Sequence, residues 1–209
     1  DYKRIGKSDI GPHTGGMSVL SPVLLAYQAF LQKIEKQIVQ PTIQGLSEEG
    51  IDYRGFIFVG LMNVEGQPYV IEYNVRLGDP EAQAVLPRID EDLLPVLYDC
   101  ASKKLTKRSL QLKTEAAATV VMVSEGYPGK YAKGKSIIGL QDVKDVLVFH
   151  AGTSTENADV KTSGGRVLAV TALDDQLSEA LEKSYSGALS ICWDGLYYRK
   201  DIGQDLLKM

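Results

Sequence analysis

Residues 69–81 read YVIEYNVRLGDPE, and this stretch decides how the 209-residue sequence is interpreted. Apolar residues occupy every second one of its first nine positions, and Glu72, Asn74 and Arg76 lie between them. Side chains of a β-strand point alternately to its two faces. The pattern therefore predicts a strand over residues 69–77 with these three polar side chains on one face and an apolar opposite face.

The polar face has a chemistry of its own. Glu72 and Asn74 offer hard oxygen ligands suited to Mg²⁺, which usually keeps several waters and completes its shell with substrate phosphates. Arg76 is a candidate for bidentate binding of a phosphate or a carboxylate. An exposed strand face often carries polar residues without any function. The following turn adds Asp79 and Glu81 at the strand end, which favours a functional site here.

The residues before this strand suggest three further elements. Residues 55–62 form a nearly unbroken apolar run, and the link around Glu65 and Gly66 predicts an antiparallel hairpin with the strand at 69–77. Residues 1–22 are rich in glycine and proline, which predicts a loop that serves a site. Apolar residues then recur every three or four positions to about residue 40, predicting a helix capped by Ser21 with Pro22 as its first residue.

The second half of the chain has a different pattern. A helix is predicted at about 90–104, and the polar residues 105–114 resemble a domain boundary. Strands are predicted at 116–124, 146–150 and 166–172, with a polar loop up to Gly165 and a helix at about 175–189. Short strands, long loops and one helix predict a small mixed α/β or barrel-like domain.

Composition excludes several classes of function. The net charge of −4 gives no basic excess for binding nucleic acid or an anionic membrane. The sequence has no apolar stretch of about 18 residues and no secretory leader, so we expect a cytoplasmic protein. Its only cysteines, Cys100 and Cys192, lie far apart and predict neither a zinc site nor a disulfide scaffold.

Residues 71–81, IEYNVRLGDPE, resemble the Glu-x-Asn-x-Arg-x-Gly-Asp-Pro-Glu signature of the phosphoribosylamine–glycine ligases. These enzymes, also called glycinamide ribonucleotide synthetases, belong to the ATP-grasp superfamily. Similar segments occur along essentially the whole chain, at residues 1–4, 11–17, 126–134, 149–153, 163–168 and 193–203. Two departures lie in the glycine-rich segment, where many members have Asn in place of His13 and Gly in place of Ser18.

The resemblance implies an α+β fold. Residues 1–106 would be the C-terminal part of an ATP-grasp domain, an antiparallel sheet with helices. Residues 107–209 would form a small mixed α/β, barrel-like C-terminal domain. The N-terminal half of the protein and the lobe that encloses adenine would precede Asp1. We therefore expect the chain alone to be an inactive fragment, because half of a nucleotide site gives little affinity.

The activity implied by the resemblance is a two-step acyl transfer in purine biosynthesis. ATP, the co-substrate, would phosphorylate the glycine carboxylate, and the amine of 5-phosphoribosylamine would then attack the glycyl phosphate. The products would be glycinamide ribonucleotide, ADP and phosphate. Glu72 and Asn74 would bind Mg²⁺ or Mn²⁺, and Arg76, Asp79 and Lys3 would be the catalytic residues that stabilise charge or hold substrate. Asp79 is equally expected as a turn former before proline.

The remaining expected site residues bind substrate. Gly15 and Gly16 allow backbone N–H groups to approach an anion, although a Gly-Gly pair is also common in simple turns. Arg166 is a candidate ligand for the ribose phosphate, or else a solvated side chain after a turn. His13 is either a general base or an ordinary exposed histidine. The complete expected set is Asp1, Thr14, Gly15, Gly16, Met17, Pro80, Glu81, Lys133, Gly164, Gly165 and Arg166.

Two other functions compete with this interpretation. One is a different ATP-grasp carboxylate–amine ligase, such as a carboxylase or a formate-using purine enzyme. The other is a non-catalytic binding module with the same fold. Magnesium-dependent ATP hydrolysis, measured on the complete protein with a panel of small carboxylic acids, would separate the three.

Overall fold

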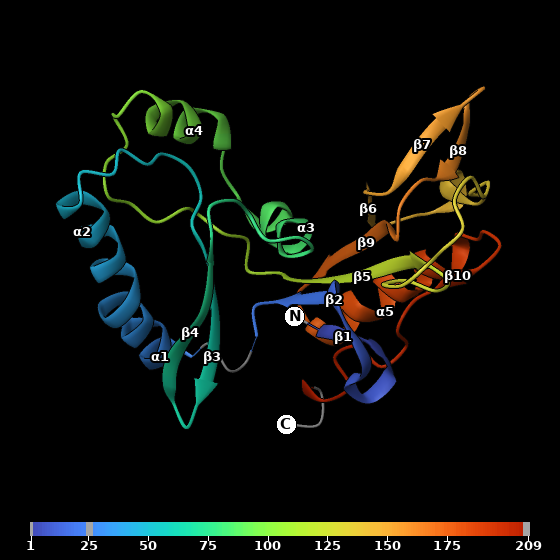
Figure 1. Ribbon diagram of the computed structural model, residues 1–209, viewed down its shortest axis with the longest axis horizontal. Helices are drawn as coiled ribbons and strands as arrows, with labels where there is room; N and C mark the ends of the chain where they lie inside the picture. The colour runs from blue at the N-terminus through green and yellow to red at the C-terminus, as the bar shows by residue number, and fades with distance from the viewer. Residues whose placement is uncertain (1, 24–26, 207–209) are drawn as a thin grey trace. The chain divides into compact units, whose positions relative to one another are not determined.

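The computed structural model describes residues 2–23 and 27–206 of the chain (Figure 1). They form two compact units that interleave along the sequence. Unit 1 consists of Asp1–Ser21, Asp79–Asp90 and Leu112–Met209, and unit 2 of Pro22–Gly78 and Glu91–Gln111. The division into domains at residues 1–106 and 107–209 remains a prediction about the sequence. The compact units do not follow it, because Ser18–Ser21 pair with Ala117–Val120 in the second half of the chain.

Unit 1 is built on a six-stranded antiparallel sheet. Its strand order is β1-β2-β5-β9-β6, and β10 pairs with the end of β5. The order has two ends, so the sheet is open. The strands are β1 Tyr2–Gly6, β2 Ile10–Ser21, β5 Ala116–Ser124, β6 Leu147–His150, β9 Arg166–Asp174 and β10 Leu196–Tyr197.

The centre of this sheet is apolar on both faces. All nine residues of β5 are buried. Met122 packs with Trp193 on the face that helix α5, Leu177–Ser190, covers (Figure 1). Val121 and Val123 pack with Met17 on the opposite face. A strand buried on both faces reads as a continuous apolar run, which is why the sequence predicted β5 with its correct bounds.

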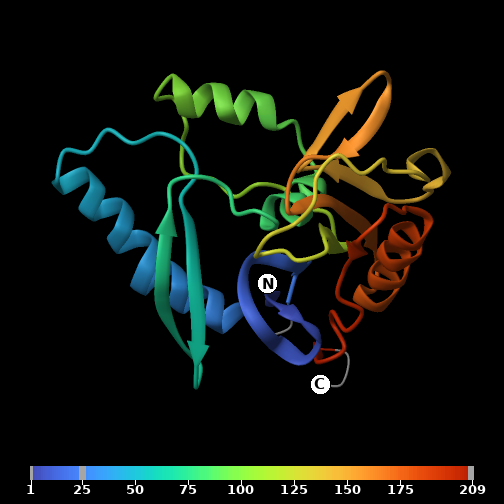
Figure 2. The same ribbon diagram turned by 45° about the vertical axis from the view of Figure 1, so that its right-hand side comes forward.

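Other parts of unit 1 differ from the prediction. The expected loop over residues 1–22 is wrong, because this segment forms β1, the 3₁₀-helix Lys7–Asp9 (η1) and β2. The expected loop before Gly165 contains a second hairpin, β7 Thr153–Glu156 and β8 Asp159–Thr162, which is clear in Figure 2. Three short helices complete the unit: α3 Glu81–Val85, η3 Leu86–Arg88 and η4 Leu140–Asp142.

Unit 2 contains the predicted antiparallel hairpin, which is confirmed. Its strands are β3 Phe58–Val64 and β4 Gln67–Asn74. Glu65 and Gly66 form the turn, with φ of 50° and 77°. Two successive residues with positive φ match the right-handed twist of the strands, so this turn fixes the pairing.

The long helix formed by α1 and α2 runs beside the hairpin of unit 2 (Figure 2). Helix α1, Gln28–Ile34, continues through a π-helical turn, Glu35–Val39 (η2), into α2, Gln40–Glu48. The predicted start at Ser21 and Pro22 is wrong, because Ser21 ends β2 and the helix begins after Tyr27. Helix α4, Leu93–Ala101, begins where the Asp92 carboxylate accepts a hydrogen bond from Leu94 N. No helix in the described ranges is long and apolar enough to cross a membrane.

Candidate functional site

In unit 2, strand β4 places two oxygen-bearing side chains on one face. Gly60 pairs with Glu72 and Leu61 with Val70, so Ile71 is a bulge residue in β4. Beyond the bulge, the Tyr73 hydroxyl lies 3.0 Å from Thr42 Oγ1 of helix α2. The flanking Glu72 and Asn74 therefore point away from α2, with Glu72 exposed and Asn74 partly exposed.

Arg76 reaches this face in another way than predicted. Strand β4 ends at Asn74, so strand alternation does not extend to residue 76. The Arg76 side chain folds back instead, and its Nη2 donates to Asn74 Oδ1 at 3.3 Å while Nη1 donates to the Leu77 carbonyl at 3.0 Å. The amide oxygen of Asn74 thus accepts a hydrogen bond from a guanidinium on the strand face that also carries Glu72.

Gly60 leaves the space that Glu72 occupies. A Cβ added to Gly60 would lie 3.0 Å from Glu72 Cγ, which is closer than nearly all such contacts in proteins. The glycine thus lets the carboxylate side chain lie across the neighbouring strand.

In unit 1, three of the expected site residues meet around one guanidinium. Arg166, the first residue of β9, donates from Nη1 to the carbonyls of Gly15 at 3.0 Å and Asp79 at 2.8 Å. Its Nη2 also forms an ion pair with Asp79 Oδ2 at 3.2 Å. Gly15 packs on the guanidinium, because a Cβ there would lie 2.9 Å from Arg166 Cζ. Gln83 Nε2 donates to the other carboxylate oxygen of Asp79 at 3.0 Å.

The glycine-rich segment is a bulge of β2. From the pair Arg4–His13 to the pair Tyr2–Ser18, β1 advances by two residues and β2 by five, so the surplus residues of β2 leave the ladder. The Thr14 hydroxyl donates to the Lys3 carbonyl at 2.8 Å and accepts from Gly16 N at 3.0 Å. These bonds join the bulge to β1.

The remaining expected residues are distributed around this bulge. Lys3 Nζ lies 3.8 Å from a carboxylate oxygen of Glu81. Met17 and Pro80 are buried, so their side chains face the protein interior and are not exposed to a ligand. Lys133 Nζ lies 5.9 Å from the centre of the Tyr131 ring. Asp1 lies outside the described residues.

Tyr127 is a site residue that the sequence did not reveal. Its hydroxyl accepts a hydrogen bond from Gly15 N at 3.1 Å. Gly165 fits against its ring, since a Cβ there would lie 2.3 Å from Tyr127 Cδ2, and the Gly164 carbonyl accepts from Ser124 Oγ at 3.0 Å. Gly164 and Gly165 therefore allow close packing beneath the bulge. A tyrosine within a Gly-Pro-rich stretch gives no signal of a partner more than a hundred residues away.

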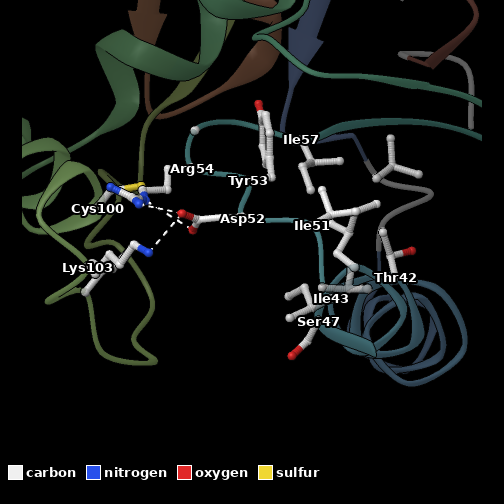
Figure 3. Close-up of a pocket in the computed structure, with 15 residues that line it drawn as sticks. Thr42, Ile43, Ser47, Ile51, Asp52, Tyr53, Arg54, Ile57, Cys100 and Lys103 are labelled. Carbon is white, nitrogen blue, oxygen red and sulfur yellow. Dashed lines mark hydrogen bonds and ion pairs between the residues drawn. The ribbon is translucent and has the colours of Figure 1, made fainter. Parts of the chain in front are cut away.

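A hollow of about 590 Å³ in unit 2 contains none of the predicted site residues (Figure 3). Its walls are mainly apolar and include Ile43 and Ile51. At its edge, Asp52 forms ion pairs with Arg54 at 2.7 Å and Lys103 at 2.8 Å. The hydrogen bonds from these two cations lower the pKa of Asp52 to about 2. The aspartate is therefore a fixed anion at neutral pH, without the pKa of a general base.

Two family models match the chain. Residues 1–82 match the phosphoribosylglycinamide synthetase ATP-grasp (A) domain, and residues 117–205 match the C domain of the same synthetase. The chain belongs to the phosphoribosylglycinamide synthetase family. The α+β fold, with the C-terminal part of an ATP-grasp domain at its start, is confirmed.

Known synthetases resemble the chain over nearly its whole length. It is 47% identical over 211 residues to a phosphoribosylamine–glycine ligase of Synechocystis sp., covering 99% of this chain and 50% of that protein. It is 44% identical to the trifunctional purine biosynthetic protein adenosine-3 of Gallus gallus, covering 97% of this chain and 20% of that protein. The crystal structure of the phosphoribosylamine–glycine ligase from Thermotoga maritima matches with a TM-score of 0.86 and 34% identity, over 96% of this chain and 50% of that one.

The chain thus spans about half the length of the curated single-function synthetases that it matches. The matched half includes both groups of side chains described above. Arg76, Glu72 and Asn74 lie in unit 2, while Lys3, Gly15, Asp79 and Arg166 lie in unit 1.

Proposed function

We propose that the chain serves in an ATP-dependent ligase that joins glycine to 5-phosphoribosylamine. The reaction would give glycinamide ribonucleotide, ADP and phosphate through a glycyl phosphate, as a cytoplasmic step of purine biosynthesis. The observation that carries the proposal is the pair of oxygens from Glu72 and Asn74 on one exposed face of β4, in a chain of the synthetase family. A non-catalytic module would have no need of this pair.

The residues of β4 fit a magnesium or manganese ion that is shared with a polyphosphate. One carboxylate and one amide oxygen are hard ligands, and too few to enclose a cation. The described residues contain no group of three or more His, Cys, Asp or Glu side chains that could hold a metal. A bound cation would offset the charge that develops on the transferred phosphoryl group. The guanidinium of Arg76 holds Asn74 Oδ1 in place and adds a second positive charge on this face.

The residues of unit 1 fit a substrate with both an anionic and a cationic group. The carboxylate of Asp79 is suited to the ammonium group of glycine. Arg166 and Lys133 are suited to the ribose phosphate, and the backbone N–H groups of Gly15 and Gly16 lie beside the guanidinium of Arg166. Lys3 and Glu81 would contact the same substrate at the rim of the bulge.

The chain spans about half the length of its relatives, so the test supplies the other half from one of them. We would join the N-terminal half of the Synechocystis ligase to this chain and measure ADP release with glycine and 5-phosphoribosylamine. Formate and bicarbonate would replace glycine in parallel reactions. Glycine-dependent turnover supports the proposal. Turnover with another acid would indicate a different ATP-grasp ligase, and no ATP turnover with any acid would indicate a binding module.

One substitution and its control then test Glu72 as a metal ligand. We expect Glu72→Gln to lower kcat by about 100-fold or more and to raise the Mg²⁺ concentration needed for half-maximal rate. Glu65→Gln, in the turn of the same hairpin, is the matched control and should have the activity of the parent. Equal activity of the two variants would remove Glu72 from the site. The 209-residue chain alone should release no ADP, and clear turnover by it would contradict the expectation of an inactive fragment.

A further inference from the structure

The C-terminal segment Tyr197–Asp205 holds strand β1 along its length. The Tyr197 hydroxyl donates to the Ile5 carbonyl at 2.9 Å, and Arg199 Nη1 donates to the Arg4 carbonyl at 3.1 Å. At the start of β1, the Tyr2 hydroxyl donates to Asp205 Oδ1 at 2.5 Å and accepts from Gly203 N at 2.9 Å. About 190 residues of sequence separate the two segments that these bonds join.

Arg199 is the centre of this contact. Only 2% of it is exposed, and its guanidinium is bidentate to Asp201, with Nε–Oδ1 at 3.0 Å and Nη2–Oδ2 at 2.8 Å. Its Nη1 also donates to Asp9 Oδ1 at 2.5 Å, and the Tyr2 ring centre lies 5.1 Å from its Cζ. Burial alone would lower the pKa of Arg199, but the two carboxylates raise it. The charge is therefore buried with its partners.

The turn of the β1–β2 hairpin depends on the same carboxylates. Ser8 and Asp9 adopt φ of 58° and 53°, in the left-handed region that side chains other than glycine, asparagine and aspartate rarely enter. The Ser8 N–H donates to Asp201 Oδ2 at 2.7 Å, and Asp9 binds Arg199 directly. Two residues in the left-handed region are thus each tied to the clasp, the group of ion pairs that Arg199 forms with Asp9 and Asp201.

The hairpin that the clasp holds carries the substrate-binding bulge. Lys3 lies on β1 between Tyr2 and Arg4, and its carbonyl accepts from Thr14 of the bulge. The bulge is held on its other side by Tyr127 and Arg166. Arg199 binds the Arg4 carbonyl on β1, Asp9 in the hairpin turn and Asp201, all of them outside the bulge Thr14–Met17. Its effect on the bulge would therefore pass through β1.

We propose that Arg199, with Asp9 and Asp201, is a positioning residue that fixes β1 and so sets the geometry of Lys3 and of the bulge Thr14–Met17. This inference rests on the proposed function, since it concerns how the aminosugar is held. A positioning role can be told apart from a general role in stability, because one ion pair of the clasp can be removed while the other stays. Asp9 has a side chain that is 62% exposed, so its removal leaves the buried Arg199–Asp201 pair in place.

The test compares Asp9→Asn with Asp174→Asn. Asp174 forms a surface ion pair with Lys183 at 2.5 Å in the same unit, on the end of β9 away from the hairpin, so its variant controls for the loss of one carboxylate. In the 209-residue chain, amide hydrogen exchange at Gly15 and Gly16 would be followed by NMR. Asp9→Asn should accelerate it about tenfold or more, while unfolding followed by Trp193 fluorescence matches that of the control.

Kinetics provide the second measurement, on the fusion with the Synechocystis half. Asp9→Asn should raise KM for 5-phosphoribosylamine about tenfold, with KM for ATP unchanged, because the bulge is displaced. Arg199→Lys keeps the charge but loses the planar fork, so it should show the same selective rise in KM. A general loss of stability would not raise KM for 5-phosphoribosylamine while leaving KM for ATP unchanged.

The outcomes separate the two proposals. If the unsubstituted fusion is inactive, the proposed function fails, and the exchange rates of Gly15 and Gly16 still decide the role of the clasp. If Asp9→Asn and Arg199→Lys leave those exchange rates equal to those of Asp174→Asn, the positioning role is refuted. The positioning role is also refuted if the exchange rates of Gly15 and Gly16 rise only as much as the lower unfolding midpoint of the variant explains.

Discussion

Ser18 is the position where we expect a substitution to stabilise the chain. It lies on β2 opposite Val120 and is 0% exposed. Within residues 2–23 and 27–206, its hydroxyl oxygen has no hydrogen-bond partner. It is also one of the two positions at which the glycine-rich segment departs from the pattern of the family. Ser18→Ala removes the hydroxyl and leaves a methyl group that fits the same space.

The magnitude follows from the cost of the unpaired hydroxyl. Burying such a group without a partner costs about 1–3 kcal/mol. Alanine has a low strand propensity, which offsets a few tenths of a kcal/mol of the gain from removing the unpaired hydroxyl. We therefore expect Ser18→Ala to raise the free energy of unfolding by about 1 kcal/mol. For a chain of this size, that corresponds to a rise in Tm of about 2–4 °C.

Ser184→Ala is the matched control with the opposite sign. Ser184 on α5 is also 0% exposed, but its hydroxyl donates to the Ala118 carbonyl at 2.7 Å and accepts from Ala172 N at 3.0 Å. The same change of side chain should lower the free energy of unfolding by about 1–3 kcal/mol, because two backbone groups lose this partner. The better helix propensity of alanine returns about 0.5 kcal/mol.

Urea unfolding followed by Trp193 fluorescence is the appropriate assay. Trp193 is the only tryptophan of the chain and is 4% exposed in the core of unit 1, the unit that contains both serines. The two variants should differ by about 1.5–3.5 kcal/mol at equal m-values. A Ser18→Ala variant that is destabilised like Ser184→Ala would refute the reasoning, because it would mean that the Ser18 hydroxyl is paired in solution.

Three further predictions concern two tightly packed glycines and one buried tyrosine. Gly60→Ala should displace the Glu72 side chain and raise the half-saturating Mg²⁺ concentration of the fusion about threefold to tenfold; Gly45→Ala, whose added Cβ meets nothing within 4 Å, should leave that concentration unchanged. Gly15→Ala should push the Arg166 guanidinium off the bulge and raise KM for 5-phosphoribosylamine about tenfold. An unchanged KM would mean that the contact between Gly15 and Arg166 plays no part in binding this substrate. Burial raises the pKa of Tyr185 to about 12, so its neutral form stabilises the fold fully below pH 10 and loses that contribution as the pH rises towards 12. Burial also raises the pKa of Tyr2, Tyr197 and Tyr198, so tyrosinate absorbance should show several late-titrating groups, and Tyr185→Phe should lower their number by one.

The sequence predicted those elements whose signals are local. Strand β5 is a run in which only Thr119 and the terminal Ser124 are polar, α5 has regular apolar spacing, and Glu65-Gly66 marks the hairpin turn. Strands β1 and β2 gave no such signal, because their glycines and polar residues are typical of a loop. They are strands because distant partners hold them: β2 pairs with β5, and β1 is bonded to the segment Tyr197–Asp205.

The same distinction applies to the site. Glu72 and Asn74 could be singled out because two residues separated by one intervening position share a strand face wherever the strand lies. Arg199 and Tyr127 could not, since their partners Asp9 and Gly15 lie 190 and 112 residues away. The sequence predicted Arg166 as a phosphate ligand but not its ion pair with Asp79, because that pair follows from tertiary packing.

The engagement of Arg166 determines how a phosphate would bind to it. Its guanidinium already donates to two carbonyls and faces the Asp79 carboxylate, so an incoming dianion must compete with that carboxylate for Nη2. The side chain of Asp79 is 53% exposed, and its ion pair with Arg166 is therefore weak enough to exchange. A phosphate at Nη2 would release the Asp79 carboxylate, which is the group suited to an ammonium ion. Binding of the anion would then favour binding of the cation. Under the proposed function, occupancy by the aminosugar phosphate and by glycine should therefore be coupled through this one pair.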